Sequence, residues 1–109
     1  MSLERSALLL GALLFALAIP LVFRWVPPNP VYGVRTSKTF SSRDVWFAAN
    51  RPAGINMAIT GFVIAVTALV VPRLIPDYSE GARRLIIAAI VILAVVIMLA
   101  RILWQVLRL

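Results

Sequence analysis

The sequence predicts an all-α integral membrane protein with three transmembrane helices and a short interfacial helix in the loop between the first two. Hydrophobic residues make up 62% of the 109-residue chain and its mean hydropathy is +1.00, whereas soluble domains are roughly 45–50% apolar. About 20 apolar residues cross a bilayer as a helix. The apolar residues are concentrated in three blocks without a charged side chain, Ser6–Phe23, Ile55–Val71 and Leu85–Ala100. We therefore expect one membrane domain over residues 1–109, with spans at about 6–26, 53–72 and 84–104.

The charge of the chain fits the same class. The net charge is +7, and the eleven basic residues are spread over every loop and both ends, as is typical of contact with anionic lipid headgroups. We expect the lipid bilayer as a partner and no nucleic acid, because the chain has no basic run or aromatic stacking platform. It contains no Cys and no His, which excludes disulfides and imidazole chemistry. With only four carboxylates, we expect no metal site and no cofactor.

The first span could be mistaken for a signal peptide, because Arg5 precedes an apolar run that reaches Ala16-Leu17-Ala18. We favour a retained span, since the apolar run continues through Phe23. Pro20 should kink its last turn, and the prolines after Val26 should end it. Small residues along this span would let another helix approach closely; they are Ala7, Gly11, Ala12, Ala16 and Ala18.

The second span has several polar side chains in its interior. Asn56, Thr60 and Thr67 lie four and seven residues apart, which places them on one helix face. Polar groups in hydrocarbon are costly without partners. This face should therefore look into the bundle, by hydrogen bonding between helices, or toward a bound molecule.

The third span is almost uniformly aliphatic from Leu85 to Ala100, which is typical of a lipid-facing helix. We expect Arg101 to snorkel outward and Trp104 to lie at the interface. The count of basic residues favours a cytoplasmic 27–52 loop. The loop side carries seven of them, Arg24, Arg35, Lys38, Arg43, Arg51, Arg101 and Arg108, and the other side four, Arg5, Arg73, Arg83 and Arg84.

The 27–52 loop contains more turn, capping, aromatic and basic residues than a simple connection between two helices needs. Asn29 and Pro30 mark a turn, and Gly33 is typical of a backbone that needs φ > 0 or a close approach. Ser41 or Ser42 can cap a helix that runs from about residue 42 to 51, with Ser41 and Asp44 at the spacing of a capping box. On that short helix, Trp46 and its fourth neighbour Asn50 share one face.

These residues resemble the SdpI family, bacterial membrane proteins named for immunity to a secreted killing peptide. Ser37 stands where a Pro often follows the Arg-Thr pair, and Asn50-Arg51 replaces a Thr-His pair of longer members. The resemblance, to a short three-span form, implies a plasma-membrane immunity protein that sequesters a hydrophobic toxin peptide and signals to a regulator. The residues that match in order and spacing are Pro28, Asn29, Gly33, Val34, Arg35, Thr36, Thr39, Ser42, Trp46, Asn50 and Gly54.

We expect a ligand site on the loop and on the polar face of the second span. Arg35 would offer a fork of donors to a carboxylate or phosphate, and Trp46 an amphipathic platform. The alternative is that Arg35 pairs with Asp44 or caps carbonyls at a helix end. The predicted ligand-binding residues are Asn29, Gly33, Arg35, Thr36, Thr39, Trp46, Asn50 and Asn56.

Other functions fit the sequence less well. A proton-coupled exporter needs a carboxylate within a span, and none of Glu4, Asp44, Asp77 or Glu80 lies in one. We expect no enzyme, because the chain has no His to activate a nucleophile and no Lys within a span. A structural or accessory subunit of a membrane complex is the main alternative to toxin binding. The sequence leaves a homo-oligomer open.

Overall fold

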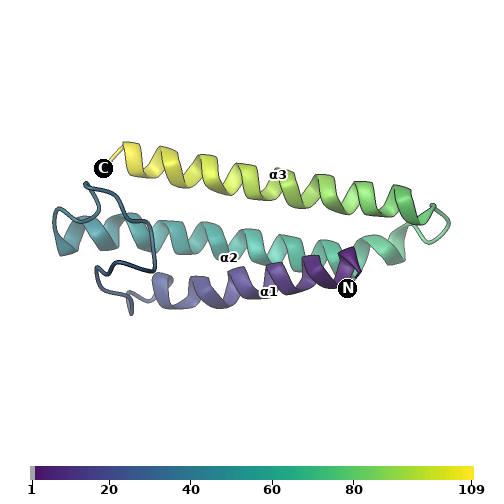
Figure 1. Ribbon diagram of the computed structural model, residues 1–109, viewed down its shortest axis with the longest axis horizontal. Coiled ribbons are helices and arrows are strands. Elements are labelled where there is room, and N and C mark those ends of the chain that lie inside the picture. The colour runs from purple at the N-terminus through teal and green to yellow at the C-terminus, as the bar shows by residue number, and fades with distance from the viewer. Residues whose placement is uncertain (1) are drawn as a thin grey trace.

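The computed structural model describes residues 2–109 and contains three helices, α1 (Leu3–Val22), α2 (Arg43–Leu74) and α3 (Glu80–Leu107). Each is long and apolar enough to cross a membrane. α2 lies between α1 and α3, and the chain termini lie at opposite ends of the bundle (Figure 1). The loop of residues 23–42, α2's first residue and the C-terminus share one end, which we call the loop end.

Serine side chains fix where all three helices begin. Ser2, Ser42 and Ser79 each accept a hydrogen bond from the backbone amide three residues later, over 3.1 Å in every case. Such a bond satisfies an amide that has no partner inside the helix. Of the two serines proposed to cap α2, Ser42 is therefore the cap, and Ser41 instead donates its hydroxyl to the Lys38 carbonyl over 2.6 Å.

The separate interfacial helix is not confirmed. Residues 43–51 are helical, but they are the first turns of α2, which continues through Pro52 for 32 residues. At 1.5 Å per residue α2 is about 48 Å long, against a hydrocarbon core of about 30 Å. An internal proline removes one helical hydrogen bond, and here the turns on either side of it are held by contacts to α1 and the loop. α2 is thus longer than the hydrocarbon, and the charged Arg43, Asp44 and Arg51 in its first turns favour an N-terminal end that extends beyond it.

α1 ends four residues earlier than the sequence predicts. Its carboxyl end forms a Schellman motif, in which Arg24 N–H donates to the Leu21 carbonyl and Trp25 N–H to the Pro20 carbonyl. Arg24 occupies the left-handed position of this motif, with φ at 60°. Glycine is usual there because an L side chain is strained in that conformation.

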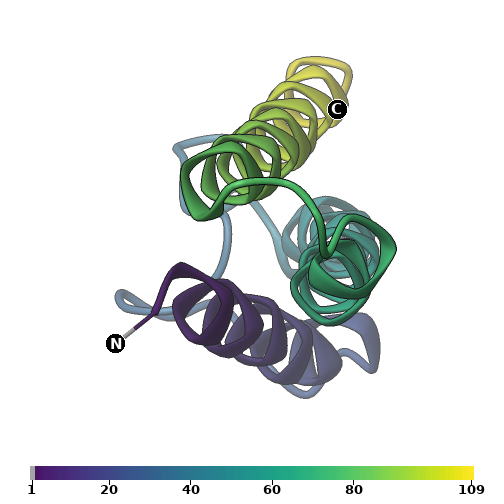
Figure 2. The same ribbon diagram turned by 90° about the vertical axis from the view of Figure 1, so that its right-hand side faces the viewer.

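α1 and α2 pack closely, as the small residues of α1 predict. A Cβ atom on Gly11 would lie 2.6 Å from the Gly61 carbonyl oxygen, and one on Gly61 the same distance from the Gly11 carbonyl oxygen. Viewed from the end opposite the loop end, α3 lies mainly along α2 (Figure 2). It also approaches α1, because Ala7 of α1 and Ile87 of α3 belong to one buried cluster. Within the described chain α3 buries only Ile87 and Met98, which is consistent with the predicted lipid-facing helix.

Candidate functional site

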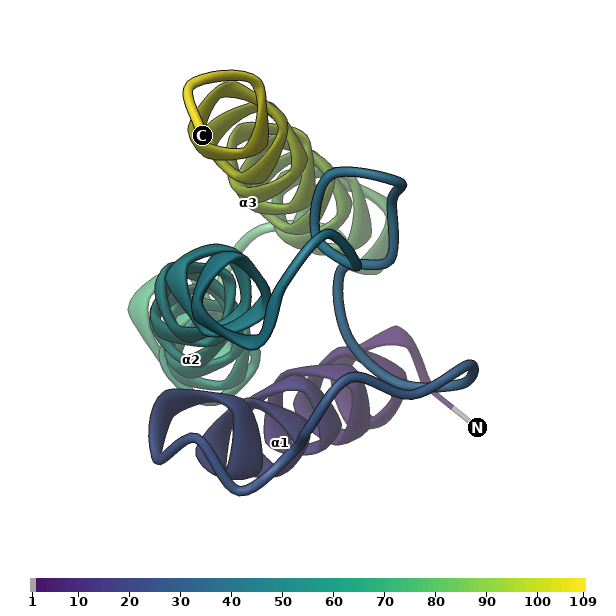
Figure 3. The same cartoon turned by 90° about the vertical axis from the view of Figure 1, so that its left-hand side faces the viewer.

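The loop is fastened to α2 by Trp46 and Asn50. Trp46 is fully buried, and its indole Nε1 donates to the Val26 carbonyl over 2.8 Å. Asn50 is 1% exposed; its Oδ1 accepts from Val34 N–H over 2.6 Å, while its Nδ2 donates to the carbonyls of Val34 and Trp46. The Asn50 amide thus pairs with both backbone groups of Val34. Figure 3 shows the loop leaving α1, crossing the loop end of the bundle toward α3, and then turning to enter α2.

Gly33 lies between these two anchors. Its φ is +114°, and a Cβ atom there would lie 2.7 Å from Oδ1 of Asn50 and 3.0 Å from the Trp46 ring. Both sequence-based reasons for a glycine, the positive φ and the close approach, are confirmed. The chain can therefore reach Asn50 only without a side chain at this position.

Three polar side chains, those of Asn29, Thr36 and Thr39, form hydrogen bonds with other groups of the loop. Asn29 Oδ1 accepts from the amides of Val31 and Tyr32, and its Nδ2 donates to the carbonyls of Pro27 and Tyr32. The buried Thr39 hydroxyl accepts from Thr36 N–H over 2.8 Å, and the Thr36 hydroxyl accepts from Thr39 N–H over 3.1 Å. With their polar atoms so engaged, these residues shape the loop.

Arg35 is different because it lies exposed on the loop. One Nη donates to the Pro30 carbonyl, and within residues 2–109 Arg35 forms no ion pair with Asp44. Of the two structural alternatives, the structure therefore contains neither the Asp44 pair nor a helix-end cap, but a bond to a loop carbonyl. Its remaining N–H groups have no protein partner in the described chain.

The outer surface of the loop combines basic and apolar side chains. Trp25 is 66% and Val31 79% exposed, and Phe40, which packs on Trp46 with ring centroids 5.3 Å apart, is 48% exposed. Beneath this surface the Tyr32 hydroxyl is buried without a partner among the described residues, and burial raises the pKa of this phenol above its ordinary value. We call the exposed set the loop surface; it comprises Arg24, Trp25, Val31, Arg35, Lys38, Phe40 and Arg43.

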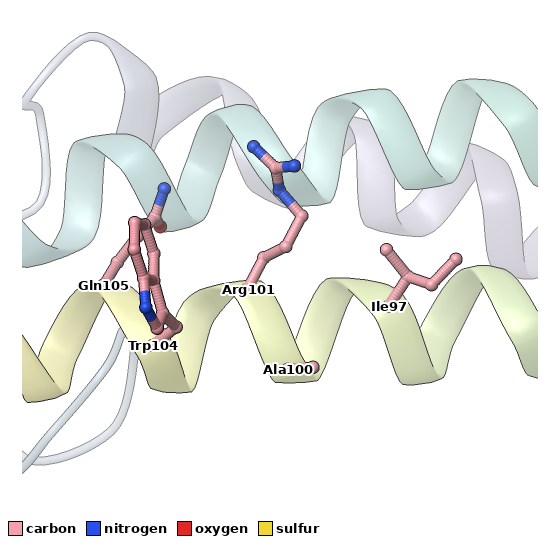
Figure 4. A pocket seen from close by; sticks show the side chains of 5 residues that line it. All are labelled: Ile97, Ala100, Arg101, Trp104 and Gln105. Carbon is pink, nitrogen blue, oxygen red and sulfur yellow. The ribbon is translucent and has the colours of Figure 1, made fainter.

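Asn56 belongs to a second polar cluster, between α2 and α3. Arg101 Nε donates to Asn56 Oδ1 over 3.0 Å, and Asn56 Nδ2 donates to Gln105 Oε1 over 3.0 Å. Figure 4 shows Arg101 and Gln105 extending from α3 toward α2. The prediction that Arg101 snorkels outward is therefore wrong, because Asn56 offers its guanidinium a partner inside the bundle.

The polar face of α2 turns inward as predicted. Asn56, Thr60 and Thr67 are all buried, and the Thr67 hydroxyl donates to the carbonyl of Val63 in its own helix over 2.8 Å. Sequence reasoning missed Gln105 altogether. The available signal was its position four residues after Arg101, which puts both polar side chains on one face at the end of an apolar block.

Similarity to known proteins covers most of the loop, all of α2 and most of α3. The SdpI/YfhL protein family matches the chain over residues 26–101. The chain belongs to the SdpI family. Together with the three apolar helices, this makes it a multi-pass membrane protein of an immunity-type family. None of the curated proteins and none of the solved structures matches this SdpI-family chain.

Proposed function

We propose that this protein captures a hydrophobic antimicrobial peptide, or a similar amphipathic ligand, on its loop surface and so keeps the ligand from acting on the membrane. One observation supports this most: the loop is held in a defined shape by hydrogen bonds within the chain itself. Trp46 and Asn50 hold its inner side, while Trp25, Val31 and Phe40 are left exposed on the outer side. A preorganised loop loses little conformational entropy on binding.

The chemistry of the loop surface fits an amphipathic peptide. Apolar side chains of a peptide can pack on Trp25, Val31 and Phe40 at the depth where tryptophan is favoured in a bilayer. Arg35 keeps N–H donors available for a carboxylate. A ligand that partitions into the headgroup region would meet this surface by lateral diffusion.

The charge distribution supports a cytoplasmic loop end. The seven basic residues on this side face a single carboxylate, Asp44, whereas the four on the other side are accompanied by Glu4, Asp77 and Glu80. Basic residues near the ends of spans favour retention in the cytoplasm. In that orientation the loop surface would also be open to a cytoplasmic regulator.

Survival of a sensitive bacterial strain exposed to a secreted hydrophobic peptide tests the proposal. Expression of the protein should protect the strain, and Arg35→Lys should reduce protection although the charge is kept, because an ammonium lacks the planar fork. Arg73→Lys, the same change at the opposite end, should leave protection intact. Equal protection by both variants, at equal membrane levels, would contradict a role for Arg35 in capture.

An accessory subunit is the second candidate, supported by the largely uncovered α3. Purification in mild detergent separates the two proposals. A subunit should bring a stoichiometric protein partner with it, whereas a capture protein should purify without one.

A further inference from the structure

A groove runs along α3; its outer part is lined by α3 alone, and its middle and inner parts lie between α2 and α3. Its outer part, near the loop end, has a volume of about 560 Å³ and is lined by Ile97, Ala100, Arg101, Trp104 and Gln105. A middle part of about 260 Å³ passes Asn56 and Thr60, and an inner part of about 270 Å³ is lined almost wholly by aliphatic side chains. Ile97 borders all three parts, so together they form one amphipathic groove.

The hydrogen-bond directions at the outer part are fixed by Arg101, which can only donate. Because Arg101 Nε donates to Asn56 Oδ1, the Asn56 amide nitrogen must face Gln105 and donate to its Oε1. The Gln105 NH₂ group itself has no hydrogen-bond partner within the described residues. The outer part thus has N–H donors on Arg101 and Gln105 and the positive charge of Arg101. This combination favours an anion that accepts hydrogen bonds.

The depth of these donors matches a phosphate of the bilayer. Arg101 directly follows the uncharged stretch Leu85–Ala100, and Trp104, a residue typical of the membrane interface, lies one turn beyond. Arg101 thus lies where the hydrocarbon gives way to headgroups. The inner part of the groove continues from there into the hydrocarbon, along Ile59, Val63 and Leu93.

We propose that this groove binds one anionic phospholipid. Its phosphate accepts hydrogen bonds from Arg101 and Gln105, and one acyl chain lies along Ile59, Val63 and Leu93. Asn56 is a positioning residue, because it turns Arg101 inward and orients the Gln105 amide. The lining of the groove favours a lipid over a soluble anion, since a soluble anion would leave its aliphatic part unfilled. An ammonium headgroup would be repelled by the positive charge of Arg101.

Lipid-dependent melting of the delipidated protein in neutral detergent tests the site. Phosphatidylglycerol should raise the melting temperature more than phosphatidylcholine does, with binding about fivefold tighter, the factor that one basic residue adds near an anionic surface. Glycerol phosphate, which has the head without the tails, should give no comparable shift. Equal stabilisation by both lipids, or an equal shift with glycerol phosphate, would overturn the proposal.

Variants assign the effect to the groove. Arg101→Gln should abolish the preference for phosphatidylglycerol, whereas Arg73→Gln, an equal loss of charge at the opposite end, should keep it. Gln105→Glu covers the case in which Arg101→Gln fails to fold. It retains the Asn56 contact but places a carboxylate beside Arg101, so the folded variant should also lose the preference. Retention of the preference in a folded Arg101→Gln or Gln105→Glu protein would refute the site.

Discussion

At the scale of single residues, Gly33 determines how the loop reaches α2. Gly33→Ala would combine strain at a φ of +114° with a contact of 2.7 Å to Asn50 Oδ1. We expect a loss of about 1–3 kcal/mol in the free energy of unfolding, measured by denaturation in detergent. Gly81→Ala is the matched control, because a Cβ at Gly81 meets nothing within 4 Å and alanine favours a helix. If the two variants are equally stable, the packing of the loop on Asn50 is not as described.

Arg24 presents the reverse case, because an arginine occupies a left-handed backbone position that favours glycine. With φ at 60° in the Schellman motif of α1, Arg24→Gly should raise the free energy of unfolding by about 1 kcal/mol. Arg43→Gly removes the same charge from the first residue of α2, where the backbone is helical, and should instead lower stability by about 0.5–1 kcal/mol. A destabilising Arg24→Gly would mean that the arginine side chain contributes more than its backbone strain costs.

Residue chemistry also explains which parts of the loop could be predicted. The positive φ of Gly33 and the turn at Asn29 follow from local preferences that these residue types carry in any protein. The direction of Arg101 could not be predicted, because it depends on Asn56, a residue 45 positions away in the chain. Trp46 was expected to face a ligand and is instead buried, since its indole N–H bonds to the Val26 carbonyl.

At the scale of elements, the three spans follow directly from apolar length, but the helix ends do not. The short helix at about 42–51 and the span from 53 were expected to be separate, yet α2 continues through Pro52. A proline removes one hydrogen bond from a helix, which can be predicted from sequence. The contacts of Trp46 and Asn50 that hold the preceding turns in place are tertiary, and a sequence does not show them. Likewise α1 ends at Val22 because Arg24 adopts a left-handed conformation. Arginine rarely adopts this conformation, so the sequence does not predict the end of the helix there.

The α1 and α2 crossing depends on two glycines. Gly61→Ala would place a Cβ 2.6 Å from the Gly11 carbonyl oxygen and 2.8 Å from the Phe15 amide, so the helices would have to separate. We expect a loss of about 1–3 kcal/mol, as for other overpacked interfaces, seen as a lower melting temperature. Ala12→Leu, on the exposed face of α1 beside Gly11, should be tolerated. A larger loss from Ala12→Leu than from Gly61→Ala would show that α1 packs through another face.

At the scale of the whole molecule, the bundle is polarised by charge along the membrane normal. The basic excess at the loop end predicts that this end is cytoplasmic. The chain lacks Cys, so single introduced thiols report the orientation. Because Ser79 caps α3, the thiol at the opposite end is better placed at the exposed Tyr78. In intact cells Ser37→Cys should resist an impermeant maleimide and Tyr78→Cys should react; the reverse pattern would place the loop outside.

Paired measurements of survival and melting temperature on Arg35→Ala show whether the folded loop presents Arg35 for binding. We predict that survival under a killing peptide falls while the melting temperature stays near that of the unchanged protein, because Arg35 is exposed and donates only one bond to the loop, at the Pro30 carbonyl. Gly33→Ala, which disturbs the loop itself, should lower both. If Arg35→Ala lowers the melting temperature as far as Gly33→Ala does, Arg35 is a structural brace and the binding role is contradicted.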